Sequence, residues 1–308
     1  ATGILEVSPI WKGRYVLSVG KEGFGLIQQE LDLSSENEYA LTLNLTEERQ
    51  APQNLQAVAE GEYDSDQLLV WNFPDMIEDG FEEHPDFEIN SPGKFGWQYI
   101  DGDGGETGAF VGYEWPGVFE PMAFMVFNPY ATEPACDVMG IYPYEGQKML
   151  ADFASYGDAN DDWFISPRLF FTEPVRFSFY AMSIDGMNPE TIQVGYSETG
   201  CEPADFIWVE ENRTVDAWWN ELCYDIPSSA KYVAIHCTSA QRRILMIDNV
   251  RLGHASLFDN PYYAPKRMPR AEGAYEVYLD GVKIGETSET TWQLRDMTLG
   301  RHTVGVRS

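Results

Sequence analysis

The chain has 308 residues, with 50 Asp and Glu against 20 Lys and Arg, which gives a formal net charge of −30 at pH 7. A charge of this sign disfavours nucleic acids and anionic membranes as partners and argues against a phosphate-binding role. Hydrophobic residues at 44% and aromatic residues at 14% suffice for packed cores, so the chain is not a disordered acidic tail. No apolar run approaches the roughly 18 residues of a membrane-spanning helix, and any secretion signal is expected upstream of residue 1.

Strand signals run along most of the chain. Apolar and polar residues alternate over Tyr39–Leu45, Val175–Tyr180 and Ile192–Tyr196, a pattern typical of half-buried strands. Turn residues separate the predicted strands at Asn90–Gly93, Asp101–Gly105, Asp185–Gly186, Asp280–Gly281 and Leu299–Gly300. Two short stretches, around Asp79–His84 and Glu145–Ala154, are the helix candidates, and neither has a sustained 3.6-residue stripe. The sequence therefore predicts an all-β fold.

The N-terminal stretch is expected to be part of a sandwich. Gly13–Phe24 places a glycine turn before a Tyr-x-Leu-x-Val strand and resembles the last strands of carboxypeptidase-regulatory-like, prealbumin-type domains. We expect residues 1–50 to form such a partial β-sandwich, with its remaining strands upstream.

A second module is divided in the sequence. Pro52, Leu55, Ala57 and Trp71 match the start of a fibronectin-type-III-like domain, with Trp71 as its core aromatic. The matching continuation begins only at Tyr275, where Asp280–Gly281 suits a type I′ hairpin turn. Residues 51–74 and 273–308 are thus predicted to form one split module, with residues 266–272 as a linker.

The intervening residues 75–265 are too many for a loop and predict a domain of their own. Five segments occur in the order found in the cleaved-adhesin, or choice-of-anchor J, family, which includes the gingipain adhesin modules; they are Gly80–Phe87, Phe95–Gly104, Ala123–Pro129, Asp162–Leu169 and Ile244–Val250. The resemblance implies a galactose-binding-like jelly-roll β-sandwich, similar to MAM domains and carbohydrate-binding modules. It also implies a secreted or cell-surface protein of a Bacteroides-type bacterium.

The same resemblance implies a structural calcium ion. In that family the Phe-Glu start and the final Ile-Asp-Asn-Val strand lie side by side, which points to Glu82 and Asp248 as Ca²⁺ ligands. Asp86, Asn249 and Glu83 are lesser candidates. The alternative is that these residues are solvated acids or turn caps.

The loop Asp101–Glu106 also suggests a ligand. It is not an EF-hand, because Glu106 occupies the sixth position and Gly112 the twelfth. A plain Gly/Asp turn is the favoured interpretation, while Asp101 and Asp103 remain candidates for calcium or ligand contact.

No sequence motif supports catalysis. The nucleophile-elbow, zinc-protease, phosphate-loop and dinucleotide motifs are absent from the sequence, so no catalytic residue is predicted and the protein is expected not to be an enzyme. Glycoside hydrolysis is harder to exclude, since 50 acids make some close carboxylate pair almost inevitable. The four cysteines fit no metal or redox spacing, and free thiols and disulfides both stay open.

Aromatic residues are the other functional signal. Trp115, Trp218 and Trp219 lie in loop-like segments near acids, where exposed rings stack on a sugar or a protein ligand. Core packing is the alternative, and it is favoured for Trp71, Trp97 and Trp163.

The sequence thus predicts a non-catalytic, adhesin-like binding protein of the cell surface or the extracellular space. Its partner would be a host extracellular protein or a glycan, engaged by a calcium-stabilised jelly roll. We expect a monomer that forms part of a larger multidomain protein. An accessory segment of a larger secreted protease or glycosidase is the alternative, and a mere spacer is the third possibility.

Overall fold

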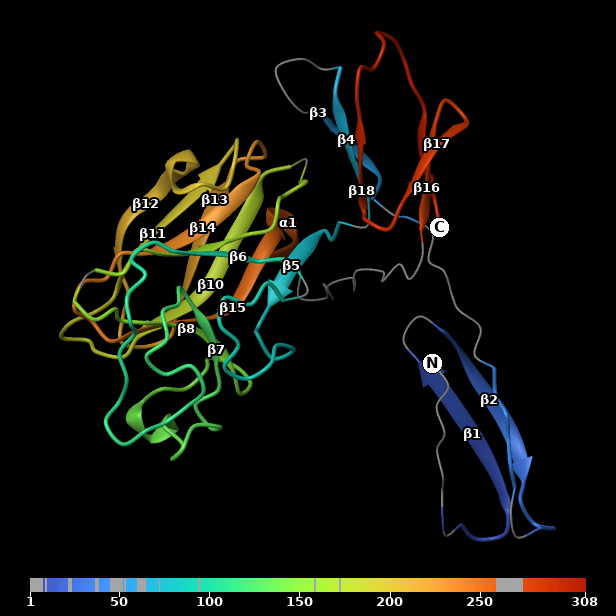
Figure 1. Cartoon of the computed structure of the whole chain (residues 1–308), viewed down its shortest axis with the longest axis horizontal. Helices are drawn as coiled ribbons and strands as arrows, with labels where there is room; N and C mark the ends of the chain where they lie inside the picture. Colours follow the sequence, from blue (N-terminus) through green and yellow to red (C-terminus); the bar gives the residue numbers. More distant parts are fainter. Residues whose placement is uncertain are drawn as a thin grey trace. The chain divides into compact units, whose positions relative to one another are not determined.

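The computed structural model divides into two compact units. Unit 1 comprises Ala1–Phe73 with Met268–Ser308, and unit 2 comprises Pro74–Arg267 (Figure 1). The structure describes residues 8, 10–21, 24–36, 39–44, 52, 54–59, 65–71, 73–93, 95–157, 159–171, 173–258 and 274–308. The predicted linker at 266–272 lies outside these residues. Among them, α1 (Ala255–Phe258) is the one α-helix, and no helix is long and apolar enough to cross a membrane. The all-β prediction is confirmed.

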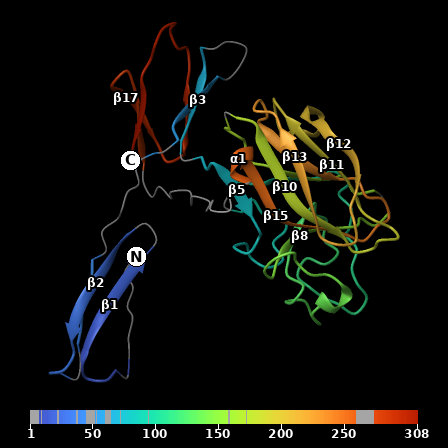
Figure 2. The ribbon, with the colours of Figure 1, turned by 180° about the vertical axis from the view of Figure 1, so that it is seen from behind.

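The first sheet of unit 2 is built around its longest strand, β15. Its strands follow the order β13 (Asn220–Ile226), β10 (Val175–Ser183), β15 (Ile244–His254), β8 (Met149–Phe153) and β7 (Met125–Phe127). The first half of β15 pairs with β8 and its second half with β5 (Met76–Asp79). This pairing places the segment around Glu82 next to the strand that contains Asp248, as predicted. Figure 2 shows β13, β10 and β15 side by side.

The second sheet of unit 2 is also antiparallel. Its order is β12 (Ile207–Thr214), β11 (Thr191–Ser197), β14 (Tyr232–Cys237), β9 (Asp162–Ile165) and β6 (Gln98–Asp101). Strands distant in sequence become neighbours here: β6 pairs with β9, and β9 with β14. The two sheets form a jelly-roll β-sandwich.

Aromatic side chains fill the core of unit 2. Phe164 on β9 packs against Phe124, which precedes β7, with ring centroids 5.9 Å apart. Phe127 on β7 and Phe153 on β8 meet edge to face at 5.2 Å. All four are at most 2% exposed, and burying each such ring stabilises the fold by roughly 1.5–3 kcal/mol.

Unit 1 contains two three-stranded sheets, one of which is assembled from both of its segments. One has the order β17 (Val282–Thr287), β16 (Tyr275–Leu279) and β19 (Val304–Arg307); the other has β18 (Thr291–Leu294), β4 (Gln67–Val70) and β3 (Gln56–Ala59). Thus β18 from the second segment pairs with β4 from the first. Trp71 and Tyr275 meet in the shared core at 5.3 Å, with Leu69, Val277 and Leu294 around them. Within residues 1–50, β1 (Arg14–Lys21) and β2 (Phe24–Asp32) form a hairpin.

Several local predictions can be compared with the structure. Asp280 and Gly281 both have positive φ, 50° and 80°, as the type I′ turn requires. The predicted strand at Tyr39–Leu45 is wrong over its described part, since residues 39–44 belong to no strand and Leu41 is 50% exposed. The helix candidate at Glu145–Ala154 instead contains β8. All four cysteines are free thiols, with Cys136 and Cys237 buried and Cys223 exposed.

Candidate ligand surface and metal centre

Five aromatic residues, which we call the aromatic surface, gather on unit 2: Tyr142, Tyr144, Tyr180, Trp218 and Trp219. Tyr144 stacks on Tyr180 with ring centroids 3.6 Å apart and meets Trp219 edge to face at 6.2 Å. The Trp219 Nε1 donates a hydrogen bond to the Tyr142 carbonyl at 3.1 Å. Trp218 is 62% exposed, and Tyr142 and Tyr144 are each 42% exposed. Trp219, one of the predicted ligand-binding tryptophans, thus contacts Tyr142 and Tyr144, and its sequence neighbour Trp218 is exposed.

The loop that carries Tyr142 and Tyr144 is held by the two predicted calcium ligands. Glu82 Oε1 accepts hydrogen bonds from the backbone N–H groups of Gln147 at 2.8 Å and Lys148 at 2.7 Å. Asp248 Oδ2 accepts one from the N–H of Glu145 at 3.0 Å. These charge-assisted bonds fix the loop at three positions within residues 145–148 and so orient the exposed rings.

Tyr180 connects the aromatic surface to the sheet. It lies on β10, opposite Glu221 on β13 and Asp248 on β15. A hydrogen bond with Tyr144 is the main cause, and burial the second, of a pKa of about 12 for Tyr180, so this phenol stays neutral at physiological pH. Neutral hydroxyls beside carboxylates offer both donors and acceptors to a polar ligand.

The predicted metal ligands differ in how well they fit calcium. Asp248 is fully buried, and burial raises its pKa to about 7, with the charge of Glu82 adding to the effect. A Cβ on Gly80 would lie 2.8 Å from Asn249 Oδ1 and 3.9 Å from Asp248 Oδ1, so the glycine allows these oxygens to approach the backbone closely. Glu82, Asp248 and Asn249 offer the oxygen donors that a hard cation takes, although Glu82 Oε1 and both Asp248 oxygens already accept backbone N–H groups.

Asp86 fits calcium less well. Its Oδ1 lies 3.1 Å from the Lys148 ammonium, which also donates to the backbone carbonyls of His84 at 2.6 Å and Glu82 at 3.3 Å. The chain's own cation thus already binds these three oxygens.

Trp115 belongs to the core, contrary to the prediction of an exposed ring. It is 6% exposed, stacks on Phe153 at 5.4 Å and meets Phe127 edge to face at 5.4 Å. It borders a hollow of about 560 Å³ that also contacts Phe110 and Phe119. The loop-like sequence Tyr113–Gly117 did not reveal that its tryptophan turns inward.

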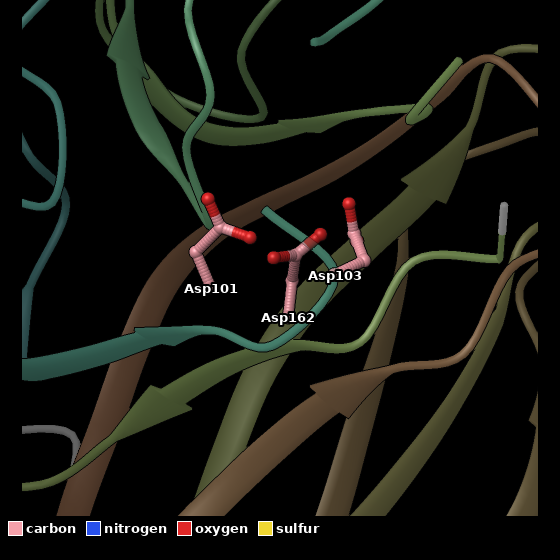
Figure 3. Close-up of side chains that lie close together, drawn as sticks. All are labelled: Asp101, Asp103 and Asp162. Atoms are coloured by element: carbon pink, nitrogen blue, oxygen red, sulfur yellow. The ribbon is translucent and has the colours of Figure 1, made fainter. Parts of the chain in front are cut away.

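Asp101 and Asp103 lie together with a residue that no sequence motif assigned to a site, Asp162. One carboxylate oxygen from each of the three lies within 4.8 Å of the other two, and Figure 3 shows the carboxyl groups gathered around Asp162. Asp101 on β6 and Asp162 on β9 are register partners. Burial, and then the charge of Asp152, raises the pKa of Asp162 to about 10. We call Asp101, Asp103 and Asp162 the acid trio.

Ser91, His84 and Asp79 are hydrogen-bonded to one another in the serine–histidine–aspartate order of a catalytic triad. Ser91 Oγ lies 3.2 Å from His84 Nδ1, and His84 Nε2 lies 3.1 Å from Asp79 Oδ2. All three residues are at most 5% exposed, and the serine hydroxyl donates to Glu88 Oε2 at 2.6 Å. These hydrogen bonds therefore stabilise the segment that follows β5, and we assign the three residues no catalytic role.

No protein-family model and no curated protein matches the chain. Similar solved structures include the K2 cleaved adhesin domain of Lys-gingipain, with 18% identity and a TM-score of 0.44, where the match covers 58% of this chain and 99% of that chain. The K1 cleaved adhesin domain of Lys-gingipain from Porphyromonas gingivalis W83 gives the same four values. The carbohydrate-binding module TmCBM61 in complex with β-1,4-galactotriose is 11% identical with a TM-score of 0.34, covering 56% of this chain and 97% of that chain. At these identities and scores, function has to be argued from the residues of this chain.

Proposed function

We propose that this protein is a non-catalytic binding protein of the bacterial cell surface or extracellular space, and that its jelly roll engages a glycan through the aromatic surface. The observation that carries the proposal is the packing of Tyr144 against Tyr180 and Trp219, together with the exposure of Tyr144, Tyr142 and Trp218, each at least 42% exposed. An exposed ring stacks on the apolar face of a sugar, and neighbouring carboxylates and hydroxyls bind its hydroxyl groups.

The net charge narrows the class of ligand. At −30, the chain repels anionic polysaccharides at long range, so we propose a neutral glycan. The role proposed is that of a monomeric, adhesin-like module within a larger multidomain protein, related to the cleaved-adhesin family. A host extracellular protein is the other ligand that an exposed aromatic surface suits.

A binding screen tests this function. The whole chain would be applied to an array that carries neutral oligosaccharides, including β-1,4-linked galacto- and xylo-oligosaccharides, together with anionic glycans and extracellular-matrix proteins. We expect retention on neutral glycans. Retention only on matrix proteins would replace the glycan by a protein ligand, and no retention at all would favour a spacer. An accessory role in a secreted protease or glycosidase would be favoured if the full-length gene encodes such a catalytic domain.

Trp218→Ala is expected to weaken binding of the retained oligosaccharide by about 30-fold or more. Truncating an aromatic anchor at the centre of a binding surface costs roughly 2 kcal/mol or more. Isothermal titration calorimetry would measure the change. The matched control is Trp11→Ala, which removes a tryptophan that is 88% exposed in unit 1 and should leave affinity unchanged. Equal affinity of Trp218→Ala and the wild type would refute the role of the aromatic surface.

We also propose that Glu82 and Asp248, with Asn249 beside them, bind a structural calcium ion beneath the loop that carries Tyr142 and Tyr144. The support is the buried Asp248 carboxylate, its acidic neighbour Glu82 and the close approach of Asn249 Oδ1 at Gly80. Calcium would then stabilise the aromatic surface as well as the sandwich.

Calcium is therefore expected to raise the melting temperature of unit 2, and Asp248→Ala should reduce this rise. A ligand that binds only the folded state stabilises it in proportion to the logarithm of its concentration. Differential scanning calorimetry in chelator and in millimolar calcium would measure both proteins. An undiminished calcium-dependent rise in Asp248→Ala would rule out this site.

A further inference from the structure

The acid trio brings like charges together without a counter-ion. Asp101 and Asp162 lie directly opposite each other on antiparallel strands, where two carboxylates repel. Asp103 joins them from the loop that follows β6. None of the three forms an ion pair with Lys, Arg or His in the described part of the chain. The arrangement is destabilising unless something neutralises it.

Three buried oxygens at this place have no hydrogen-bond partner among the described residues. They are Asp162 Oδ1, Asp152 Oδ2 and Ser155 Oγ, on side chains that are 1%, 1% and 8% exposed. A buried polar atom without a partner costs free energy, and a buried carboxylate costs more. Three such atoms in one neighbourhood indicate a group that would bind them.

These oxygens adjoin the acid trio. Asp152 interacts electrostatically with both Asp162 and Asp103. A Cβ on Gly105 would collide with the Ser155 hydroxyl and would lie 2.7 Å from Asp103 Oδ1. The absence of a side chain at Gly105 therefore lets the Ser155 hydroxyl lie close to Asp103 Oδ1.

The donor set selects the kind of ligand. The acid trio offers only carboxylate oxygens, which suit a hard divalent cation. Calcium binds oxygens at about 2.4 Å, so two ligands on opposite sides of one ion lie about 4.8 Å apart. The trio's oxygens all lie within 4.8 Å of one another. Magnesium requires a stricter octahedron and keeps several waters.

We propose that Asp101, Asp103 and Asp162 bind a calcium ion, at a site distinct from Glu82 and Asp248. The ion joins the end of β6 to the start of β9 and fixes the glycine loop 102–105 between them. Asp152 and Ser155 supply further oxygens at its inner side.

Calcium titration of the full chain tests the proposal. The wild type is expected to bind one calcium ion here, and a second if Glu82 and Asp248 also bind one. Asp103→Asn keeps an acceptor oxygen for the loop but removes a charge, and is expected to weaken this binding event at least about tenfold. The control is Asp185→Asn, which makes the same change in another turn, where Asp185 accepts the N–H of Met187 at 2.9 Å. It should bind calcium like the wild type.

Asp162→Asn provides a readout that loss of a structural contact would not give. Because it removes a buried carboxyl whose Oδ1 has no hydrogen-bond partner among the described residues, we expect a higher melting temperature than the wild type in chelator and a smaller rise on adding calcium. If this variant does not fold, Asp103→Asn and Asp101→Asn, at partly exposed positions, still decide the question.

The two calcium sites can be distinguished because each variant should lose calcium binding at one site only. Asp248→Asn should leave binding at the trio intact, and Asp103→Asn should leave binding at Asp248 intact. If Asp103→Asn and Asp101→Asn both retain the wild-type stoichiometry, affinity and thermal shift, the trio binds no calcium and the proposal is overturned.

Discussion

Trp115→Ala should lower the free energy of unfolding of unit 2 by about 3–5 kcal/mol, the range for truncating a fully packed aromatic side chain. Trp115 is 6% exposed and contacts Phe127 and Phe153 across the core. Its removal leaves a cavity that these rings fill only in part. Denaturant unfolding followed by circular dichroism would measure the loss.

The contrasting variant is Trp218→Ala. Its ring is 62% exposed, so its removal should change stability by no more than about 0.5 kcal/mol. Burial thus separates a tryptophan that stabilises the sandwich from one that is free to contact a ligand. If Trp115→Ala were as stable as the wild type, the packing described around this ring would be wrong.

Trp71→Ala should destabilise unit 1 by a similar amount, about 3–5 kcal/mol, while unit 2 keeps its own stability. Trp71 is fully buried, and its ring centroid lies 5.3 Å from that of Tyr275. This contact joins the two sequence segments of unit 1, one before unit 2 and one after it. The core cluster around these residues is small, so losing one aromatic removes a large share of it. Calorimetry should show one transition displaced or lost and the other retained.

Trp11→Ala is again the matched control, because it removes an exposed tryptophan from the same unit. It should leave both transitions in place. An unchanged transition for unit 1 in Trp71→Ala would contradict the shared core of the two segments.

Local pattern predicted much of the fold. Alternation located β10 and β11, and Asp280–Gly281 marked the turn between β16 and β17. The same alternation at Tyr39–Leu45 did not produce a strand over its described residues. Alternation shows only that one face of a segment is apolar, and a strand also needs a neighbour with which to exchange hydrogen bonds.

The sites were harder to predict because they depend on pairing between distant strands. Asp101 was a candidate from its glycine-rich loop, but Asp162 was not, since its place beside Asp101 arises from the pairing of β6 with β9. Trp218 and Trp219 were candidates as aromatic residues in a loop, whereas Tyr180 lies in a strand and is linked to Trp219 through Tyr144. Trp115 was placed wrongly because its local sequence does not determine which way the ring points.

The most direct test of the glycan-binding surface is a nuclear magnetic resonance titration of the whole chain with the oligosaccharide retained on the array. Trp218 and Trp219 should show shifted indole N–H signals at saturation. Trp163, whose Nε1 donates to Asp161 Oδ1 at 2.9 Å, serves as the internal reference and should stay in place. If the signals of Trp218 and Trp219 stay fixed while others move, the ligand binds elsewhere and the proposed surface is wrong.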